Sequence, residues 1–471
     1  KSIREETQKV IDGLLKENPT ESDSNNLRAF QILHNAYLQR IDEHKKGIEW
    51  DKVESLPKEF SIDYESLPAE QSSNATAELL KKICIVKING GLGTSMGCTG
   101  PKSVIEIKDG KNFLDLTIAQ IKSLSNKYGV VVPLVLMNSF STQAETQKVI
   151  DKYNGDSNVR ILTFMQHKFP RIDAKTLIPV CTHLNGRKEE WYPPGHGDFI
   201  QSFVDSEAFK TLKSEGKEYL FMSNVDNLGA TFDLKIMHHF VDHNLDFALE
   251  LTPKTINDIK GGTLIRYGDK LKMLEIAEVP SEHVKEFQDI KKFKVFNTNN
   301  IWMNMNSIQH VVEERILMNK MDIIVNPKKD GDRDVIQLEI AVGSAVAAFK
   351  NTTAYIVPRS RFFPVKGCTD LFILQSSLFK FSEDGYLESN THKLSDAPPK
   401  ITFSNDLKMV GDYKQHIRSI PNIDELNTLE ISGNVIIEEG VVLKGDVKLV
   451  NESNEPMIIK STDISGTVIK K

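Results

Sequence analysis

Residues 83–103 read Ile-Cys-Ile-Val-Lys-Ile-Asn-Gly-Gly-Leu-Gly-Thr-Ser-Met-Gly-Cys-Thr-Gly-Pro-Lys-Ser. The stretch begins as an aliphatic strand and continues into a loop that holds five glycines and ends on Pro-Lys-Ser. Glycine lets the backbone turn through positive φ and approach a ligand closely, and the bare N–H groups of such a loop form an anion-binding concavity. Lys102 adds a positive charge at the end of the loop. The stretch therefore predicts a site for a nucleoside triphosphate or another phosphate ester.

The loop differs from two common phosphate-binding motifs. A Walker A loop has Gly-x-x-x-x-Gly-Lys-Ser/Thr, but here Pro101 separates Gly100 from Lys102. A dinucleotide fingerprint has Gly-x-Gly-x-x-Gly, whereas the residues between Gly93 and Gly97 are one too many for that spacing. A tight structural turn is the simpler alternative to phosphate binding. The density of glycines and the terminal lysine favour phosphate binding over that turn.

The composition is that of an ordinary globular protein with two or three domains. The chain has 471 residues, of which 39% are hydrophobic and 26% are charged, and domains usually hold about 100–200 residues. A net charge of −6 argues against a general nucleic-acid or membrane-surface binder. The cysteines form no Cys-x-x-Cys pair, which indicates reduced thiols in a cytoplasmic protein without a zinc site. We expect no membrane span, because the sequence has no apolar run of about 18 residues.

Hydrophobic spacing divides the chain into three regions. Residues 1–78 carry apolar side chains at helical spacing over about the first sixty positions, followed by an extended linker. Residues 79–385 alternate short aliphatic runs with amphipathic helices, which predicts an α/β fold with a largely parallel sheet that binds its ligand at the carboxyl ends of the strands. We expect strands at 83–88, 130–137, 219–222, 245–251 and 346–349, and helices at 114–124 and 141–153.

The third region, residues 386–471, shows a repeat of six. Aliphatic residues recur at Ile431, Ile437, Leu443 and Leu449. A six-residue aliphatic period is typical of hexapeptide β-helix coils, with a plain meander of strands as the alternative. A β-helix offers a stacking surface, so we expect this region to form a homo-oligomer contact rather than to carry catalysis.

Polar residues follow the apolar run at 219–222. Asn224 and Asp226 come next, and parallel sheets bind ligands at the carboxyl ends of their strands. Mg²⁺ takes one or two carboxylates together with substrate phosphates, while a turn or helix cap is the alternative use of such residues. Because a phosphate loop lies in the same region, we predict that Asp226 binds Mg²⁺.

Further segments carry side chains suited to a ligand, although each could also be a structural turn or a solvated face. Asn and Gln side chains offer a donor and an acceptor together, as sugar hydroxyls and base edges require. These segments are the glycine-flanked His196 in 191–198, the amides of 296–302, the cations of 359–366, Lys260 with its two following glycines, and Gln166. Among the cations, Lys366 follows Phe-Phe-Pro-Val, so we expect it to be held against apolar packing, where a phosphate partner best explains its charge.

These segments, in this order, resemble the eukaryotic UTP–glucose-1-phosphate uridylyltransferases over nearly the whole chain. The most specific part is Asn-Gly-Gly-Leu-Gly-Thr-Ser-Met-Gly-Cys-x-Gly-Pro-Lys-Ser, supported by Pro-Pro-Gly-His-Gly-Asp, Ser-Asn-x-Asp-Asn-Leu-Gly and Phe-Asn-Thr-Asn-Asn-x-Trp. The resemblance implies a nucleotide-sugar nucleotidyltransferase fold, Rossmann-like with a mixed, mostly parallel sheet, and a C-terminal left-handed β-helix. The family usually has lysine where this chain has Thr99 and leucine where it has Ile88.

The resemblance also implies roles for single residues. Lys102 and Lys366 are the catalytic cations that contact the phosphates, and Asp226 holds the Mg²⁺ cofactor. The uracil and ribose contacts are Ile88, Asn89, Gly90, Gly91, Gln166 and Gly195. The remaining substrate contacts are His196, Asn224, Lys260, Asn297 and Asn299, with the sugar hydroxyl contact open between Asn297 and Asn299.

The implied reaction converts UTP and glucose 1-phosphate to UDP-glucose and pyrophosphate by direct attack of the sugar phosphate on the α-phosphorus. That nucleophile is already ionised at neutral pH, so no general base is needed. The expected partners are these substrates and products, with no nucleic acid and no membrane. Three other hypotheses stay open at this point: a UDP-N-acetylhexosamine or broad UDP-sugar pyrophosphorylase, an inactive nucleotide-binding assembly protein, and a kinase.

Overall fold

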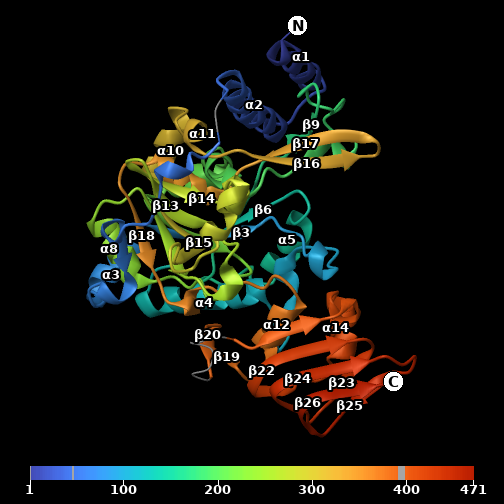
Figure 1. Cartoon of the computed structure of the whole chain (residues 1–471). Helices are drawn as coiled ribbons and strands as arrows, with labels where there is room; N and C mark the ends of the chain where they lie inside the picture. The colour runs from blue at the N-terminus through green and yellow to red at the C-terminus, as the bar shows by residue number, and fades with distance from the viewer. Residues whose placement is uncertain (1, 45–46, 391–397) are drawn as a thin grey trace.

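An eight-stranded mixed sheet forms the centre of the protein in the computed structural model, which describes residues 2–44, 47–390 and 398–471 (Figure 1). Its strand order is β2-β18-β12-β15-β11-β3-β6-β7. Neighbouring strands pair in parallel except at β15, which runs antiparallel to both β12 and β11. The strands are β2 (Ser61–Asp63), β3 (Ile83–Asn89), β6 (Leu134–Asn138), β7 (Ile161–Met165), β11 (Tyr219–Asn224), β12 (Phe247–Pro253), β15 (Val295–Asn304) and β18 (Thr352–Ile356). The predicted α/β class with a mostly parallel sheet is confirmed.

Both faces of this sheet are buried, as the unbroken aliphatic runs of its strands require. Successive side chains of a strand point to opposite faces, and in β3 Ile83 and Ile85 join one hydrophobic cluster while Cys84 and Val86 join another. The first cluster takes in α3 (Ser73–Leu80), α4 (Phe113–Tyr128), α5 (Gln143–Asp151) and α8 (Leu234–Asp242). The second takes in α6 (Phe199–Val204), α7 (Glu207–Ser214), α10 (Met305–Glu313) and α11 (Leu317–Lys320).

The N-terminal region is only partly helical. Helices α1 (Ile3–Leu15) and α2 (Glu21–Asp42) form where the apolar spacing predicts them, each with a capping box at its start. Helix beyond position 42 was expected, but residues 50–66 form short turns and strands instead. Strand β1 (Val53–Ser55) pairs with β13, and β2 becomes the outer strand of the central sheet. The linker therefore takes part in the fold.

The expected strand at 346–349 is wrong. Residues Val342–Ala348 form a 3-10 helix, and the strand follows as β18. Small aliphatic residues give the same pattern in a buried helix as in a buried strand, so periodicity alone does not separate the two. The expected strand at 130–137 also begins late, at Leu134.

Smaller sheets surround the central one. Strands β13 (Thr263–Tyr267) and β14 (Lys270–Leu274) form a hairpin, and β1 pairs with β13 as the third strand of this sheet. Helix α9 (Val284–Phe287) follows β14 in the sequence. Strands β16 (Ile324–Asp330) and β17 (Arg333–Glu339) pair with β9 (Ile172–Asp173). The remaining short pairs are β4 (Glu106–Lys108) with β5 (Lys111–Asn112), β8 (Phe169–Pro170) with β10 (Trp191–Tyr192), and β19 (Phe379–Phe381) with β20 (Leu387–Ser389).

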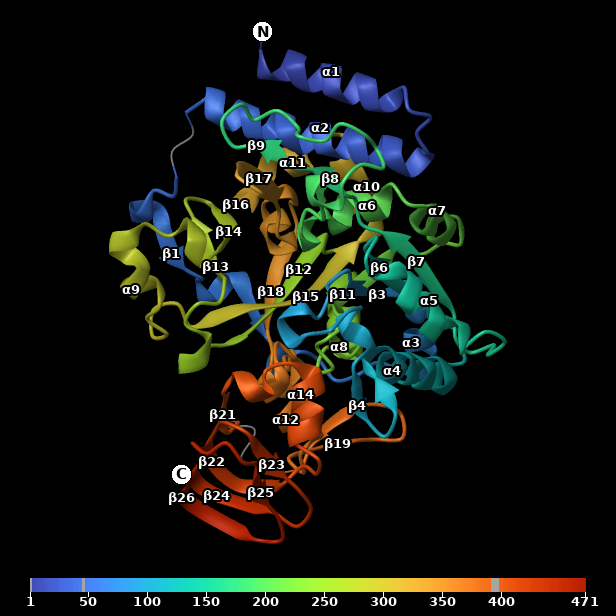
Figure 2. The same ribbon diagram turned by 90° about the vertical axis from the view of Figure 1, so that its right-hand side faces the viewer.

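The C-terminal region is built from parallel strands, at the opposite end of the molecule from α1 and α2 (Figures 1 and 2). One sheet contains β21 (Lys400–Phe403), β22 (Asn422–Ser432), β24 (Val442–Asn451) and β26 (Asp463–Lys470), and a second contains β23 (Val435–Ile437) and β25 (Met457–Ile459). The aliphatic residues of the six-residue repeat are buried between these strands. Residues 391–397 of the region lie outside the described residues.

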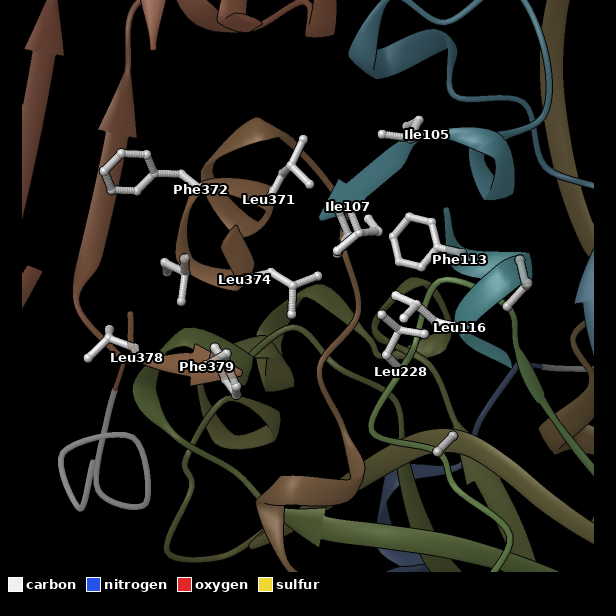
Figure 3. Close-up of a cluster of buried hydrophobic side chains, with 14 of the residues drawn as sticks. Ile105, Ile107, Phe113, Leu116, Leu228, Leu371, Phe372, Leu374, Leu378 and Phe379 are labelled. Carbon is white, nitrogen blue, oxygen red and sulfur yellow. The ribbon is translucent and has the colours of Figure 1, made fainter. Parts of the chain in front are cut away.

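The C-terminal region packs on the rest of the chain through apolar side chains. Helix α12 (Cys368–Gln375), which precedes this region and shares its core, lies beside the segment that follows the glycine loop, and Figure 3 shows Leu371 and Leu374 directed toward Ile107 and Phe113. The buried side chains of the C-terminal strands and of the first cluster form one continuous core. Helix α14 (Val410–His416) lies next to α12 in Figure 1. No helix among the described residues is long and apolar enough to span a membrane.

A buried ion pair joins β12 to the segment that follows β18. Glu250 of β12 is fully buried, and its carboxylate accepts hydrogen bonds from Arg361 at 2.6 and 2.9 Å. The same carboxylate accepts from Trp302 at 2.9 Å and from Asn300 at 3.2 Å. These four hydrogen bonds compensate the negative charge of the Glu250 carboxylate, which would otherwise be costly to bury.

We therefore expect Arg361→Met to destabilise the protein by about 3–5 kcal/mol, because it leaves the Glu250 carboxylate buried without its cation. Urea unfolding measures the change. The control is Arg418→Met, which removes the surface pair with Glu438, where the Arg418 side chain is 54% exposed, and should cost less than about 1 kcal/mol. Equal effects of the two substitutions would contradict the role given to the buried pair.

Candidate functional site

The segments that carry the candidate residues meet at the carboxyl edge of the central sheet. Strands β3, β6, β7, β11 and β12 all run in the same direction, so the loops that follow them emerge at one edge. In the register of β11 and β3, Asn224 lies opposite Ile88, and the Val225 N–H donates to the Ile88 carbonyl at 3.2 Å. The glycine loop and the Asp226 segment are therefore direct neighbours.

The glycine loop folds back on itself like a small hairpin. Leu92 bridges to Pro101, and the Lys102 N–H donates to the Gly91 carbonyl at 3.3 Å. A Cβ on Gly93 would lie 2.7 Å from the Cys98 Sγ, so this position has no room for a side chain. Several residues of the loop, Gly91 and Thr99 among them, are exposed to solvent and open to a ligand.

The side chain of Asn89 forms hydrogen bonds within the protein rather than facing a ligand. The residue is 2% exposed, and its amide donates to Asn138 at 2.7 Å and to Thr146 at 2.9 Å. Its side-chain oxygen accepts from the Ser103 hydroxyl at 2.5 Å. These bonds fix the start of the glycine loop and leave the main chain of Asn89 as the part that could reach a ligand.

Gln166 lies against Gly90. A Cβ on Gly90 would lie 2.4 Å from the Gln166 Oε1, so only glycine allows the amide its present position. The Gln166 N–H donates to the Asn138 carbonyl at 2.8 Å, which holds the residue at the end of β7. The structure thus brings together two residues that the sequence separates by more than seventy positions, both predicted to contact the uracil.

The loop that contains Gly195 and His196 is fixed by close backbone contacts. Gly195 has φ +87°, and a Cβ there would lie 2.7 Å from the Ile340 carbonyl oxygen. The Gly197 N–H donates to the same oxygen at 2.9 Å. Glycine is required at Gly195 both by its backbone conformation and by this contact.

His196 is an uncharged hydrogen-bond donor. Its Nδ1 accepts from the Val342 N–H at 3.1 Å, which assigns the ring proton to Nε2. Burial lowers the pKa of His196 to about 4, so the ring is neutral at physiological pH. The ring can donate to a sugar or phosphate oxygen, but it adds no positive charge.

Lys102 and Asp226 form an ion pair at the centre of the site. Lys102 Nζ lies 2.7 Å from Asp226 Oδ2, and the two side chains are 19% and 17% exposed. The pair joins the glycine loop to the loop after β11. Both groups are near enough to solvent for a charged ligand to reach them.

The three cations predicted at 359–366 lie in different surroundings. Arg359 pairs with Asp258 at 2.6 Å, and Arg361 pairs with Glu250 in the core. The sequence suggested that Lys366 is held against apolar packing, but Lys366 is exposed and its neighbour Val365 is the buried residue. The cluster is therefore not one cationic surface.

Lys366 is nevertheless anchored beside Asp226. The Val365 N–H donates to the Asp226 carbonyl at 3.3 Å, and Asn227 bridges to Pro364. Asp370 lies close to both lysines: burial raises the pKa of its carboxyl, and the charges of Lys366 and Lys102 oppose that rise. Both predicted catalytic cations thus lie on the same side of the site.

A bulge in β15 directs the predicted sugar-binding amides. Pairing with β12 shifts between Leu249 and Leu251, and Asn299 has φ +63°. The Asn299 amide donates to Asn224 Oδ1 at 3.0 Å, and its N–H donates to Asn297 Oδ1 at 2.9 Å. Asn299 Oδ1 is buried with no hydrogen-bond partner among the described residues, which marks it as an acceptor awaiting a donor.

Lys260 and a carboxylate that the sequence analysis missed lie around the two following glycines. Lys260 is exposed, and the Asn297 N–H donates to the Gly262 carbonyl at 2.8 Å. A Cβ on Gly262 would lie 2.5 Å from both carboxylate oxygens of Glu275. Glu275 follows β14 and carries no motif of its own, so only the fold places its carboxylate beside the predicted sugar contacts.

A metal ion at this site would rely on Asp226. No group of three or more His, Cys, Asp or Glu side chains with metal-ligand geometry occurs in the part of the chain that the structure describes. Mg²⁺ commonly takes one or two carboxylates and completes its shell with substrate phosphates and water. A single carboxylate beside two lysines fits a metal that arrives with a polyphosphate.

The chain is similar in sequence to proteins of one known family. A sequence model described as UTP–glucose-1-phosphate uridylyltransferase matches residues 27–444. The chain belongs to this family. It is 45% identical over 464 residues to UTP–glucose-1-phosphate uridylyltransferase 2 of Dictyostelium discoideum, covering 98% of this chain and 92% of that protein. It is 46% identical to a probable UTP–glucose-1-phosphate uridylyltransferase of Schizosaccharomyces pombe, covering 93% and 87%.

Solved structures show the same likeness. The UDP-glucose pyrophosphorylase of Leishmania major has a TM-score of 0.84 at 29% identity and covers 98% of each chain. A variant of that enzyme in complex with UDP-glucose has a TM-score of 0.81 at 27% identity, covering 96% of this chain and 100% of the other. The similarity extends over the whole chain, including the C-terminal region.

We expect Gly90→Ala to fold and to raise the KM for UTP by about tenfold, the equivalent of one lost hydrogen bond. The new Cβ would displace the Gln166 amide, which is the end of a flexible side chain and can move without disturbing the core. The control is Gly411→Ala in α14, where no atom lies within 4 Å of the new Cβ. An unchanged KM for UTP in Gly90→Ala would contradict the assignment of Gln166 to the nucleotide site.

Proposed function

We propose that the carboxyl edge of the central sheet binds UTP and glucose 1-phosphate and transfers the uridylyl group to the sugar phosphate. The products are UDP-glucose and pyrophosphate. The observation that carries this proposal is the convergence of Lys102, Asp226 and Lys366 beside a glycine loop and a set of sugar-suited amides. The names of the relatives favour glucose 1-phosphate over other sugar phosphates as the acceptor.

The nucleotide lies along the glycine loop in this proposal. Residues Ile88–Gly91 contact the uracil and ribose through the backbone, and the base edge meets Gln166 and the backbone of Gly195. The free side-chain oxygen of Asn299, with Asn224, Asn297 and the neutral His196, contacts the glucose phosphate. Lys260, which is exposed, and the Glu275 carboxylate, which lies beside Gly262, are the remaining proposed contacts.

The reaction needs charge stabilisation rather than proton transfer. An oxygen of the sugar phosphate forms a bond to the α-phosphorus of UTP, and the bond from that phosphorus to the bridging oxygen of pyrophosphate breaks. The attacking oxygen is already ionised, so no residue has to remove a proton. Lys102 and Lys366 neutralise the charge on the phosphate oxygens, and the fixed loops hold the two substrates in line.

We propose Mg²⁺ as the cofactor, with Asp226 as its protein ligand. When bound, Mg²⁺ supplies charge neutralisation of the phosphates. Without it, Asp226 holds Lys102 through the ion pair and keeps the lysine ammonium pointing into the site. This single carboxylate at the end of a buried strand is the support for the proposal.

For the C-terminal region we propose a left-handed β-helix that makes a homo-oligomer contact. From Thr428 to Ser432, the partners in β22 and β24 are eighteen positions apart, as in Ile431 with Leu449, which corresponds to a coil of three six-residue sides. Strand β26 ends its sheet, and the exposed aliphatic side chains near that end are Ile458, Val468 and Ile469. Exposed edge strands with apolar side chains favour association with another chain.

The proposed division of the chain is an N-terminal region at 1–78, a catalytic domain at 79–385 and the β-helix region at 386–471. We also propose a cytoplasmic location. Its support is that all four cysteines are free in the structure, three of them buried, which suits a reducing compartment.

We expect Lys366→Ala and Asp226→Ala to be folded and to lose on the order of 10²–10³ in kcat, because each removes a group that neutralises or organises transition-state charge. Pyrophosphate release from UTP and glucose 1-phosphate measures the loss, with thermal melting to confirm folding. The matched control is Lys380→Ala, a lysine whose side chain is 58% exposed in a pair with Glu388. Near-normal turnover in either site variant would contradict the proposed roles.

Removal of Mg²⁺ provides a separate test of the cofactor. Chelation with EDTA should abolish pyrophosphate release, and added Mg²⁺ should restore it, because the lysines alone cannot balance a triphosphate and a sugar phosphate. Full activity after exhaustive chelation would contradict a metal at Asp226.

A further inference from the structure

A buried histidine lies directly after Gln166 and takes no part in the chemistry proposed above. The side chains of His167 and Asp198 are 5% and 2% exposed. One carboxylate accepts twice from the same residue: Asp198 Oδ2 from the His167 main-chain N–H at 2.7 Å, and Asp198 Oδ1 from His167 Nδ1 at 2.8 Å. This two-point contact fixes both the backbone and the ring of His167.

The contact joins two loops of the nucleotide site. His167 follows Gln166 at the end of β7, while Asp198 is the last residue of the turn His196–Asp198 that begins after Gly195. These loops come from distant parts of the sequence and present the two groups proposed to meet the uracil. The His167–Asp198 ion pair therefore ties the segment that follows Gln166 to the turn that follows Gly195.

A second carboxylate and the N-terminal helices support this pair. His167 Nε2 lies 3.5 Å from Asp205 Oδ2, at the end of α6, and Arg28 of α2 lies 3.6 Å from Asp205 Oδ1. The Lys168 N–H donates to Asn26 Oδ1 of α2 at 3.3 Å. Helix α2, which carries no chemical motif, thus packs directly behind the loop that contains Gln166.

The charges around His167 are balanced. Burial by itself would lower its pKa, but the Asp198 and Asp205 carboxylates outweigh burial and raise the pKa to about 9. The ring is therefore protonated: Nδ1 donates to Asp198, and Nε2 lies within ion-pair distance of Asp205. Arg28 offsets the second carboxylate, and the nearby Lys168 lies over the Trp191 ring at 5.0 Å rather than facing His167.

Base selectivity needs such a fixed geometry. Uracil and cytosine differ in whether the ring edge accepts or donates at two adjacent positions. A glutamine amide offers both a donor and an acceptor. The amide can rotate so that its oxygen and nitrogen exchange places, so by itself it can pair with either base. Selectivity requires a second group that cannot turn over, at a fixed distance from the amide, and the backbone of Gly195 is such a group.

We propose that the His167–Asp198 ion pair is a positioning element that sets the preference for a uracil base by holding Gln166 and Gly195 at a fixed separation. This inference rests on the proposed function, because it takes Gln166 and Gly195 as the base contacts. His167 and Asp198 touch no substrate. They act through the two loops that they join.

The test compares UTP with CTP in pyrophosphate release with glucose 1-phosphate and Mg²⁺. In Asp198→Asn and His167→Gln, the ratio of kcat/KM for UTP to that for CTP should fall about tenfold, as expected for one misplaced hydrogen-bonding group. The KM for UTP should rise, and the KM for glucose 1-phosphate should stay within about twofold of its original value. A general loss of structure would instead change both KM values and leave the base ratio unaltered.

Two further variants keep the test decisive. Asp205→Asn keeps an acceptor for Nε2 and removes one charge, so it should fold and lower the same ratio by a smaller factor. His238→Gln is the matched control: His238 is a buried histidine of α8, bonded to Thr76 at 3.0 Å, and its loss should lower the melting temperature without changing the ratio. An unaltered ratio in every folded variant of His167, Asp198 and Asp205 would overturn the proposal.

Gln166→Ala separates this proposal from the proposed function. If Gln166→Ala lowers the base ratio while the ion-pair variants do not, the positioning role fails and the nucleotide site stands. If Gln166→Ala leaves the ratio unchanged, the assignment of the base contacts fails, and the positioning role fails with it.

Discussion

The ion pair between Lys102 and Asp226 is the interaction on which the site depends. It joins the glycine loop to the loop after β11 at 2.7 Å, and the main chain of Asp226 in turn anchors the segment that carries Lys366. Three segments far apart in the sequence are held in one place by these contacts. The parallel direction of β3 and β11 makes the contact possible, because both loops leave the same edge of the sheet.

Three of the cations in and around the site are paired with carboxylates. Lys102 is compensated by Asp226, Arg359 by Asp258 and Arg361 by Glu250. In the proposed reaction, phosphate groups supply negative charge beside the lysines, and the proposed divalent ion supplies positive charge beside the Asp226 carboxylate. Two polyanions can then lie side by side although the chain as a whole has a net charge of −6. The uncharged His196 fits this balance, since it donates a hydrogen bond without altering the local charge.

The sequence predicted those parts of the site that consist of contiguous motifs. The glycine loop, Asp226 and the amides of β15 carry chemistry in their own residue types, and β3, α4 and β11 follow from hydrophobic spacing. Contacts between distant residues were not predictable. Nothing near Glu250 indicates that it pairs with Arg361, and nothing near His167 indicates Asp198, because each pairing is created by the fold. The strand expected at 346–349 failed for a local reason: a short aliphatic run does not distinguish a buried helix from a buried strand.

The most direct test of the central claim is pyrophosphate release from UTP with Mg²⁺, measured separately with glucose 1-phosphate, galactose 1-phosphate and N-acetylglucosamine 1-phosphate. The account predicts rapid release with glucose 1-phosphate and little with the other two, because glucose 1-phosphate is the proposed acceptor and Asn299 and Glu275 are its proposed sugar contacts. Preference for another sugar would contradict the proposed acceptor. The absence of release with all three, from folded protein, would contradict uridylyl transfer itself.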